Sequence, residues 1–391
     1  MPITSQKDSP FSFKLSQEQS LIESTVREIS EKEFAPKAAQ IDREHRFPSE
    51  NWDILVQSGL VGLPFPEEYG GAGLDHICYA IAVEELAIAC ATTAVMYSAH
   101  VSLCATPIHL FGSKEQKERL LKPLCTGQKM GAFALSEPGS GSDSAAATCA
   151  ATLKGNEFIL NGVKNWITNG AQADYYLVIA QSDPILKHKG LIAIIVEKDS
   201  PGFSFGKLED KLGIKGSSTC QIIFENTPVP KENMLGNIGD GFKVAMVTLD
   251  GGRIGIGAQA VGIAQGAWNH ALSYARQREA FGHRVCDFEA IRLMFADMQT
   301  EIDAARLLTY HASLVQDKGL QFTKEAATAK LYASEVAMRS TVKCVQIFGG
   351  YGYVTDYPAE RYMRDAKITE IYEGTSEIQR LVIANQLLKG N

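Results

Sequence analysis

The sequence contains no run of about 18 consecutive apolar residues, the length that a membrane-spanning helix needs, so no membrane span is expected. It has no basic excess either. The formal net charge is -7, and neutralising phosphates requires a basic face, which argues against nucleic acid as a partner. The segment from Met1 to Lys7 lacks the patterns of secretory signals and transit peptides. We therefore expect a cytoplasmic protein, or a mitochondrial matrix protein if the chain is a processed form.

Patterns for metal binding and disulfide formation are absent as well. The eight cysteines are scattered without a C-x-x-C pair, and the eight histidines include no H-E-x-x-H motif. This spacing predicts reduced cysteines in the protein core and no metal site. No G-x-G-x-x-G motif lies between a strand and a helix, which argues against a Rossmann dinucleotide site.

The order of residue patterns predicts a mainly α-helical protein with a central β domain. Ser16 and Gln19 form a capping box ahead of an amphipathic pattern, and helical periodicity continues to about Leu124. From Gly131 onward, short β-rich stretches alternate with turn residues, until helical periodicity returns after Pro230. A chain of 391 residues with 45% hydrophobic residues has room for two or three domains. We divide it into an N-terminal helical domain (1–127), a middle β domain (128–236) and a C-terminal helical domain (237–391).

The individual elements follow from the same periodicities. The predicted strands cover residues 147–153, 157–160, 175–180, 191–196 and 221–224, and the predicted C-terminal helices cover 241–278, 288–316, 323–348, 358–371 and 375–387. Residues 251–266 carry six glycines inside one helix, each of which weakens an isolated helix by about 1 kcal/mol relative to alanine. Close packing must compensate, and packing against another helix explains each glycine at least as well as ligand contact.

The most informative residue is Glu373, near the C-terminus. We interpret Ser376 and Gln379 as a capping box, which predicts a helix start there and leaves Glu373 in the turn before it. Apolar surroundings from Ile371 and Tyr372 would disfavour the charged carboxylate and raise its pKa toward the range of a general base. On the local pattern alone, the commoner role of such a glutamate is to complement the helix dipole.

Two longer segments resemble the signatures of a known family. Residues 131–143, which read GAFALSEPGSGSD, resemble the first signature of the acyl-CoA dehydrogenase family, and residues 346–365 resemble the second. Together with the Tyr-Glu-Gly-Thr turn at 372–375, they stand in the family's order and spacing. The resemblance extends over residues 15–388 and is closest to the short-chain, or butyryl-CoA, branch.

This resemblance implies an N-terminal helical domain, a β-barrel-like middle domain and a C-terminal four-helix bundle, assembled as a homotetramer. It implies α,β-dehydrogenation of a short-chain acyl-CoA to the trans-2-enoyl-CoA, with electrons passed to an electron-transfer flavoprotein. Such a reaction needs a base for the α-proton, an acceptor for the β-hydride and donors for the carbonyl oxygen. Side chains cannot accept a hydride, so a redox cofactor is required, and the resemblance implies FAD.

The resemblance also assigns cofactor-binding residues by match of motif. Trp166 is implied to cover the flavin ring, although a tryptophan can also anchor a core. Arg278 and Phe281 match residues that reach the cofactor of a neighbouring subunit. Where the family usually has glutamine, this chain has Glu289, whose carboxylate a pyrophosphate would repel unless it is paired. The implied cofactor-binding set is Phe133, Leu135, Ser136, Gly141, Ser142, Trp166, Ile167, Thr168, Arg278, Phe281, Glu289, Gln346, Gly349, Gly350, Thr375 and Glu377.

For the substrate, the resemblance implies that Glu373 is the catalytic base. Its backbone amide is implied to help hold the thioester oxygen. Arg253 is implied to contact the CoA part, with an ion pair to Asp250 as its alternative role. The implied substrate-binding set is Ser142, Asp250, Arg253, Tyr372 and Gly374.

The same resemblance separates this chain from related branches. Enzymes for isovaleryl-CoA and long-chain acyl-CoA place their base at the position of Gly252, where glycine cannot serve. Glutaryl-CoA enzymes need an arginine for the distal carboxylate, and residues 90–101 contain no Arg or Lys. Residues 97–104 resemble the short-chain enzymes. The alternatives are a dehydrogenase of branched, cyclic or aromatic acyl-CoA, an acyl-CoA oxidase, and a non-enzymatic scaffold or nucleic-acid-binding relative.

Overall fold

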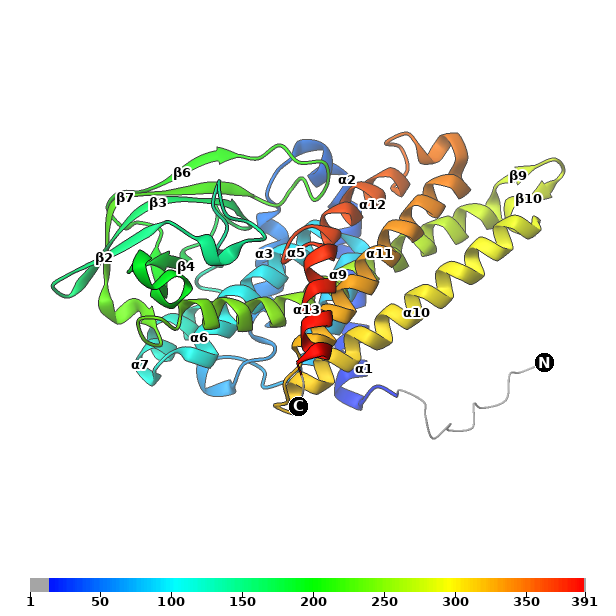
Figure 1. Ribbon diagram of the computed structural model, residues 1–391. Helices are drawn as coiled ribbons and strands as arrows, with labels where there is room; N and C mark the ends of the chain where they lie inside the picture. The colour runs from blue at the N-terminus through cyan, green and yellow to red at the C-terminus, as the bar shows by residue number, and fades with distance from the viewer. Residues whose placement is uncertain (1–13, 390–391) are drawn as a thin grey trace.

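The computed structural model describes residues 14–389 (Figure 1). Along the chain, helices come first, a sheet follows, and further helices complete the fold. The predicted order of helices, strands and helices is confirmed. Figure 1 shows the eight-stranded sheet at one end of the molecule, with the long C-terminal helices extending toward the other. In the part of the chain that the structure describes, no helix is long and apolar enough to cross a membrane. The same residues include no group of three or more His, Cys, Asp or Glu side chains that could hold a metal ion.

The N-terminal part of the chain is helical, and α4 and α5 are its most buried helices. They are α1 (Gln17–Ile29), α2 (Ala35–Glu44), α3 (Ser49–Gln57), α4 (His76–Ala89), α5 (Ala91–Ser98), α6 (Thr106–Phe111), α7 (Lys114–Gln116) and α8 (Lys122–Cys125). The capping box of Ser16 and Gln19 is present at the start of α1, as predicted. Between α5 and α6 the chain forms a π-helical segment, Ala99–Ala105, all of which is buried. Such wide turns concentrate at functional sites.

The sheet comprises β1 (Gly131–Ala134), β2 (Ala150–Lys154), β3 (Glu157–Ile167), β4 (Tyr175–Gln181), β5 (Leu191–Glu197), β6 (Phe203–Leu208), β7 (Cys220–Pro230) and β8 (Met234–Leu235). The strand order is β6-β7-β3-β2-β4-β5-β8, with β1 parallel to β4. Although β4 and β6 are far apart in this order, the rings of Tyr176 and Phe203 lie 4.8 Å apart. The sheet therefore curls over its own core.

Several strand predictions need correction. Strand β3 continues to Ile167, beyond the predicted end at residue 160, because a register shift after Leu160 lets its pairing with β7 resume at Gly162. Strand β7 likewise continues to Pro230, beyond the predicted end at residue 224. Strands β1, β6 and β8 were not predicted, because β1 and β8 have only four and two residues and β6 has no buried residue.

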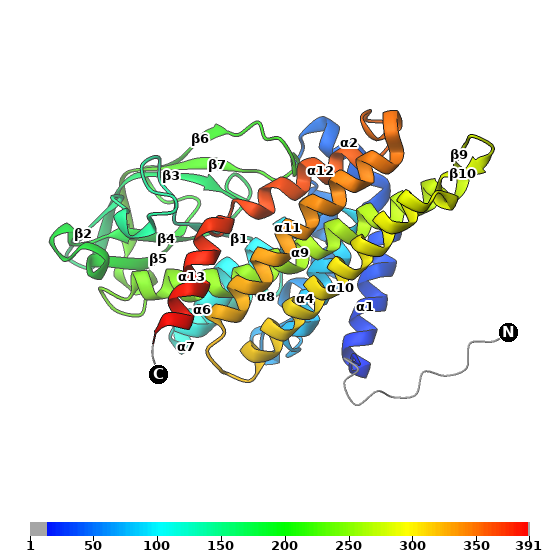
Figure 2. The same ribbon diagram turned by 45° about the vertical axis from the view of Figure 1, so that its right-hand side comes forward.

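The C-terminal part is a bundle of long helices. Its helices are α9 (Gly241–Gln277), α10 (Glu289–Asp317), α11 (Thr323–Phe348), α12 (Ala359–Lys367) and α13 (Ser376–Leu388), and a small hairpin of β9 (Glu279–Ala280) and β10 (His283–Arg284) joins α9 to α10. Figure 2 shows α9, α10 and α11 running beside one another, with α13 near the sheet. The glycines of α9 allow close packing, as expected. A methyl group at Gly262 would overlap the carbonyl oxygen of Glu84 and lie 2.7 Å from Cβ of Ala87, both in α4.

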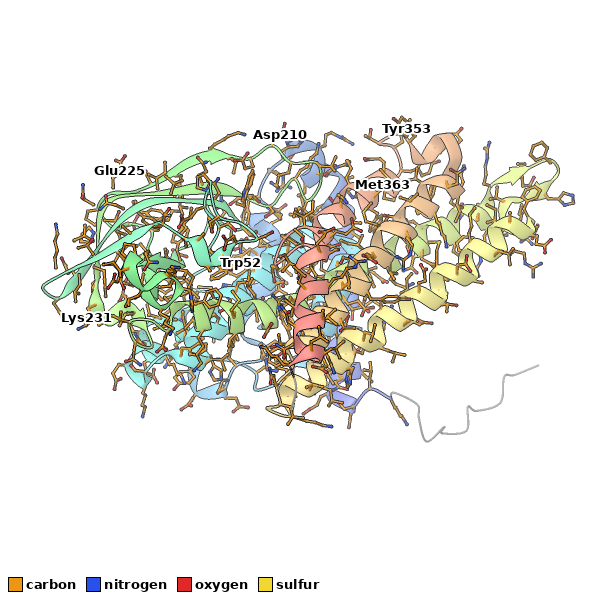
Figure 3. All side chains as sticks on the ribbon, viewed as in Figure 1. Trp52, Asp210, Glu225, Lys231, Tyr353 and Met363 are labelled. Atoms are coloured by element: carbon orange, nitrogen blue, oxygen red, sulfur yellow. The ribbon has the colours of Figure 1, made fainter. Side chains whose placement is uncertain are left out.

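Polar contacts tie the sheet to the helices near the site. The loop after β6 reaches the N-terminal helices, where Figure 3 labels Asp210. Its carboxylate lies 3.6 Å from the ring of His45. Further along the same loop, the backbone N–H of Ile214 donates to buried Asp365 of α12 at 2.5 Å. Because α12 leads directly to Glu373, these contacts fix where that turn stands relative to the sheet.

Candidate active site

The turn that carries Glu373 connects α12 to α13. Thr375 caps α13: its Oγ1 accepts a hydrogen bond from the N–H of Ile378 at 3.3 Å. The capping box predicted for Ser376 and Gln379 is therefore wrong. Ser376 is already the first helical residue, and its hydroxyl is buried without a partner among the described residues. The cap lies one residue earlier because Thr375 has the non-helical backbone that a cap requires, with φ of -59° and ψ of 164°.

Glu373 and Gly374 both have left-handed backbone angles, with φ of 54° and 93°. For a residue with a side chain, this conformation costs roughly 1–2 kcal/mol, so the surrounding structure must impose it. The side-chain amide of Gln379 donates to the carbonyl oxygens of Glu373 at 3.1 Å and Gly374 at 2.8 Å. Nζ of Lys330, on α11, donates to the same Gly374 oxygen at 2.6 Å. Two donors thus hold the strained turn.

The strained turn directs the Glu373 carboxylate toward α9. A methyl group at Gly252 would overlap Oε2 of Glu373, and would lie 3.0 Å from its Cδ and 2.7 Å from a methyl of Leu103. Leu103 belongs to the buried π-helical segment. Among the described residues, Oε2 of Glu373 is buried without a hydrogen-bond donor. The absent side chain at Gly252 is what makes room for the carboxylate.

Burial raises the pKa of Glu373 from its ordinary 4.5 to about 7, and the positive charges of Lys330 and Arg253 oppose that rise. The expected effect of apolar surroundings on this carboxyl is therefore present. A carboxylate with a pKa near neutrality and a lone pair free of donors is suited to accept a proton from a carbon acid.

Arg253 and Asp250 form an ion pair within α9. The Arg253 guanidinium lies 2.6 Å from Oδ1 of Asp250, whose Oδ2 accepts a hydrogen bond of 2.6 Å from the hydroxyl of Thr323. Burial lowers the pKa of Arg253 and raises that of Asp250. The alternative role foreseen for Arg253 is thus present in the structure. Its Nε, however, is buried and lacks an acceptor in the described part of the chain, which leaves one donor for a ligand.

Tyr372 is held by a hydrogen bond to α9. Its hydroxyl donates a short hydrogen bond to Oε1 of Gln259 on α9, and the Gln259 amide donates to the carbonyl of Ala91 at 3.2 Å. Burial raises the pKa of Tyr372 well above its ordinary value, so the phenol stays neutral. Nearby, Tyr79 of α4 shares a 2.8 Å hydrogen bond with Ser98.

Sequence reasoning missed four residues of this site: Leu103, Gln259, Lys330 and Gln379. Only Lys330 carried a usable signal. It is a lysine among Ala326, Ala327, Ala329 and Ala333, on the apolar face of a helix, where an unpaired charge is not expected. Leu103 and Gln259 have no distinguishing local pattern. Gln379 was predicted only as the partner of Ser376 in a capping box, and tertiary contacts alone show its role at the turn.

Hydrogen bonds and an ion pair join the two middle-domain segments that the resemblance implies for cofactor binding. The N–H of Asn165 donates to the carbonyl of Ser136 at 2.8 Å, which joins the loop after β1 to the end of β3. Beneath this junction, fully buried Lys164 forms a 2.7 Å ion pair with Glu137 and donates to the Leu135 carbonyl at 2.9 Å. Phe133 is half-buried in β1, and Leu135 and Ile167 are buried. Thr375 caps α13 and Glu377 lies in its first turn, and Figure 2 shows α13 near the sheet.

These residues fit a flat aromatic cofactor with a phosphate chain. The side chain of Trp166 is 62% exposed even though its backbone is held at a φ of 63°. A tryptophan so exposed does not anchor a core. Gly141 and Ser142 are exposed, and the space beside Gly141 is open, so the loop can present backbone amides to an anion. Half-buried Thr168 follows directly after β3.

The other residues that the resemblance implies for cofactor binding belong to the end of α9, the β9–β10 hairpin, the start of α10 and the end of α11, and Figure 1 shows this hairpin at the bundle end away from the sheet. They are Arg278, Phe281, Glu289, Gln346, Gly349 and Gly350. A cleft of about 840 Å³ is lined by Arg278, Gly349 and Gly350 among others. The Arg278 guanidinium lies 5.4 Å from the centre of the Tyr351 ring. Phe281, at the tip of the hairpin, is 94% exposed. Within one chain, the structure therefore does not bring this group to Glu373.

Glu289 is exposed in the first turn of α10 and forms no ion pair among the described residues. Its carboxylate there complements the positive end of the helix dipole. Among the described residues, no cation is paired with Glu289 to offset the repulsion between its carboxylate and a pyrophosphate.

Comparison with known proteins agrees with this geometry. The family models for the acyl-CoA dehydrogenase N-terminal, middle and C-terminal domains match residues 16–128, 132–227 and 239–388. A short-chain specific acyl-CoA dehydrogenase of Clostridium acetobutylicum is 52% identical, over 96% of this chain and 100% of the relative. The mitochondrial short-chain specific enzyme of Homo sapiens is 50% identical, over 97% of this chain and 92% of the relative.

Solved structures are equally similar. The structure of butyryl-CoA dehydrogenase from Megasphaera elsdenii superposes with a TM-score of 0.95 at 47% identity, covering 97% of this chain and 100% of that one. A chain from a structural study of the electron transferring flavoprotein of Acidaminococcus fermentans gives a TM-score of 0.96 at 50% identity, with coverage of 97% and 100%. With all three domains matched in order, the chain belongs to the acyl-CoA dehydrogenase family of FAD-dependent flavoproteins.

Proposed function

We propose that this acyl-CoA dehydrogenase oxidises short-chain acyl-CoA to the trans-2-enoyl-CoA, with Glu373 as the base that removes the α-proton. The observation that carries the proposal is the Glu373 carboxylate, held in a strained turn against Gly252, with a buried Oε2 that lacks a donor. The similarity to enzymes named for short-chain acyl-CoA and butyryl-CoA supports the substrate class.

Each residue of the site has a role in this proposal. Glu373 accepts the α-proton at Oε2, and its backbone N–H donates to the thioester oxygen as enolate character develops. Arg253 binds the CoA part through the donor that Asp250 leaves free. Tyr372 and Gly374 flank the base and shape the path by which the acyl chain enters.

FAD supplies the acceptor for the β-hydride. In the proposal, Trp166, Ile167 and Thr168 cover the flavin ring, and Ser136, Gly141 and Ser142 hold the pyrophosphate. Phe133, Leu135, Thr375 and Glu377 complete this near group.

The far group lies too distant to serve the same cofactor within one chain. We propose that Arg278, Phe281, Gln346, Gly349 and Gly350 complete the FAD site of a neighbouring subunit in a homotetramer. The 94% exposure of Phe281 supports this arrangement, because an aromatic side chain left in solvent on one subunit can be covered by another.

We also propose an electron-transfer flavoprotein as the physiological electron acceptor. A similar chain occurs in the structural study of the Acidaminococcus fermentans electron transferring flavoprotein, which supports this partner. The curated relatives include bacterial and mitochondrial proteins, so the compartment stays a prediction. The domain boundaries at 127/128 and 236/237 are likewise kept as proposals.

The test is anaerobic reduction of the purified holoenzyme by a panel of acyl-CoA thioesters that varies chain length, branching and ring substituents. Bleaching of the flavin spectrum by butyryl-CoA supports the proposal. Bleaching only by branched, cyclic or aromatic thioesters moves the protein to another substrate class, and no bleaching by any thioester contradicts dehydrogenation. Comparing turnover with oxygen and with an electron-transfer flavoprotein then separates oxidase from dehydrogenase.

A further inference from the structure

Lys330 is a fully buried lysine in the middle of α11. Its neighbours on that face are small, with Ala326, Ala327, Ala329 and Ala333 all fully buried. Taking an ammonium group out of water is unfavourable unless a partner compensates. A hydrophobic residue would fill the same place in the helix without that penalty, so the lysine is a candidate for a specific role.

The partner of Lys330 is the turn of the proposed base. Its Nζ donates to the carbonyl oxygen of Gly374 at 2.6 Å, directly after Glu373. No carboxylate of the described residues forms an ion pair with Lys330. The positive charge is therefore satisfied by a neutral carbonyl, and it stays available to act on the nearby carboxylate.

Two cations, Arg253 and Lys330, act on Glu373, and only one of them has an ion-pair partner among the described residues. Arg253 already has a partner, since its guanidinium lies 2.6 Å from Asp250. The negative charge of Asp250 largely cancels the electrostatic effect of Arg253 on more distant groups, whereas no carboxylate in the described part of the chain cancels that of Lys330 in this way. Lys330 is also the larger of the two opposing influences on the pKa of Glu373.

We propose that Lys330 is a positioning residue for Glu373, which holds the strained turn through Gly374 and makes the carboxylate easier to ionise through its uncompensated charge. This inference rests on the proposed function, because it assigns Lys330 to the same proton abstraction. Gln379 also holds the strained turn in place, since its amide donates to the carbonyl oxygens of Glu373 and Gly374, but it brings no charge.

Other charged or titratable groups face this pair. Glu373 interacts electrostatically with Arg253 of α9, Tyr79 of α4 and Tyr372 of the turn. The carboxylates of Glu370 and Glu377 raise the pKa of Lys330. Burial lowers the pKa of Lys330 to about 8, and Glu373 opposes that change. Below pH 8 the lysine is thus mainly charged. Burial raises the pKa values of Tyr79 and Tyr372, so both phenols are neutral there and add no charge to the pair.

The test compares four variants by the pH dependence of the single-turnover rate of flavin reduction by butyryl-CoA. Lys330→Gln keeps an amide donor without the charge, and Lys330→Met removes both. Gln379→Leu removes the other donor and keeps the charge. Lys343→Met is the control, because Lys343 lies on the same helix but pairs with Asp297 at 3.3 Å. Each protein is first checked for bound FAD and cooperative unfolding.

We expect the acidic limb of the profile to move upward by about one pH unit in Lys330→Gln and Lys330→Met, with a rate about tenfold lower on that limb. Gln379→Leu should slow the reaction at all pH values without moving the limb, and Lys343→Met should match the wild type. A folded, FAD-containing Lys330→Gln with an unmoved limb overturns the inference even if Lys330→Met fails to fold. If the wild type is not reduced by any acyl-CoA, the proposed function itself is wrong.

Discussion

Gly252 of α9 and Glu373 of the turn before α13 lie directly against one another, so closely that no side chain could stand at Gly252 without overlapping the carboxylate. The side chains of positions 252 and 373 would therefore occupy the same space, so a carboxylate fits at one position only if the other has no side chain there. This explains why a chain that presents Glu373 has glycine on the facing helix, despite the cost of about 1 kcal/mol that glycine imposes on a helix interior.

Gly252→Ala should lower the rate of flavin reduction by about 100-fold, since an added methyl must push the carboxylate aside and misplacement by 1 Å can have an effect of that size. Overpacking should also reduce the free energy of unfolding by roughly 1–3 kcal/mol. Stopped-flow reduction and urea unfolding measure the two effects. The control is Gly251→Ala, where the new methyl would meet nothing closer than the Gln316 amide at 4.0 Å. Equal rates in both variants would show that the contact does not constrain the base.

Glu373→Gln should retain FAD and bind acyl-CoA but lose turnover by roughly 10²–10⁴-fold, because the amide preserves the shape and cannot accept a proton. Anaerobic stopped-flow reduction by butyryl-CoA measures this, beside a titration of ligand binding. Glu335→Gln is a suitable control, since Glu335 pairs with Arg380 on the bundle surface. Near-wild-type reduction in Glu373→Gln would assign the base to another residue.

Glu373 should also destabilise the folded protein above neutral pH. Its pKa is raised to about 7 from 4.5, so the stability contributed by its neutral form is complete below pH 4.5 and is lost as the pH rises through about 7. Glu373→Gln should therefore be more stable than the wild type by about 1–3 kcal/mol at pH 8, and the difference should shrink toward pH 5. Urea unfolding of both holoenzymes across this range measures it. A difference that does not change with pH would contradict the raised pKa.

The order of helices and strands was predictable because local periodicity reports it. Apolar residues recur with helical spacing along α1 and along α9 to α11, whatever packs against these helices. In β4 and β5 they form short continuous apolar runs between turn residues. The long signature motifs likewise predicted the family, since each runs over many consecutive residues.

The geometry around Glu373 was less predictable because it depends on contacts between distant segments. The sequence pattern predicted Ser376 as the cap, and only the backbone shows that Thr375 is the one used. The role of Lys330 depends on Gly374, which lies 44 residues away along the chain. Sequence motifs also could not show that Arg278, at the end of α9, stands apart from the turn before α13 within one chain, since a motif carries no distance.

Chain-length preference should be limited to roughly C4 to C6. The π-helical segment Ala99–Ala105 is wholly buried, and its Leu103 already lies close to Gly252 beside the base. A longer acyl chain could gain about 0.8 kcal/mol for each buried methylene, so only overlap with a closed pocket can reject it. We expect kcat/KM for butyryl-CoA to exceed that for octanoyl-CoA at least tenfold. A clear preference for octanoyl-CoA would show that the pocket extends beyond Leu103.

Arg278→Ala should weaken FAD retention and subunit association together, because Arg278 is proposed to meet the cofactor of a neighbouring subunit. Removing the guanidinium takes away a charge-assisted contact to the pyrophosphate. A cofactor held only by the assembled state shifts the equilibrium toward assembly, so loss of one promotes loss of the other. Arg276→Ala is the control, since Arg276 is exposed one helical position before the end of α9.

Analytical ultracentrifugation with detection at the flavin absorbance follows both effects in one experiment. We expect Arg278→Ala to dissociate at higher protein concentration than the wild type and to release flavin over the same dilution range, while Arg276→Ala behaves as the wild type. A variant that keeps full flavin at dilutions where it is monomeric would show that one chain holds FAD unaided. In that case the cleft lined by Arg278, Gly349 and Gly350 must serve something other than a neighbour's cofactor.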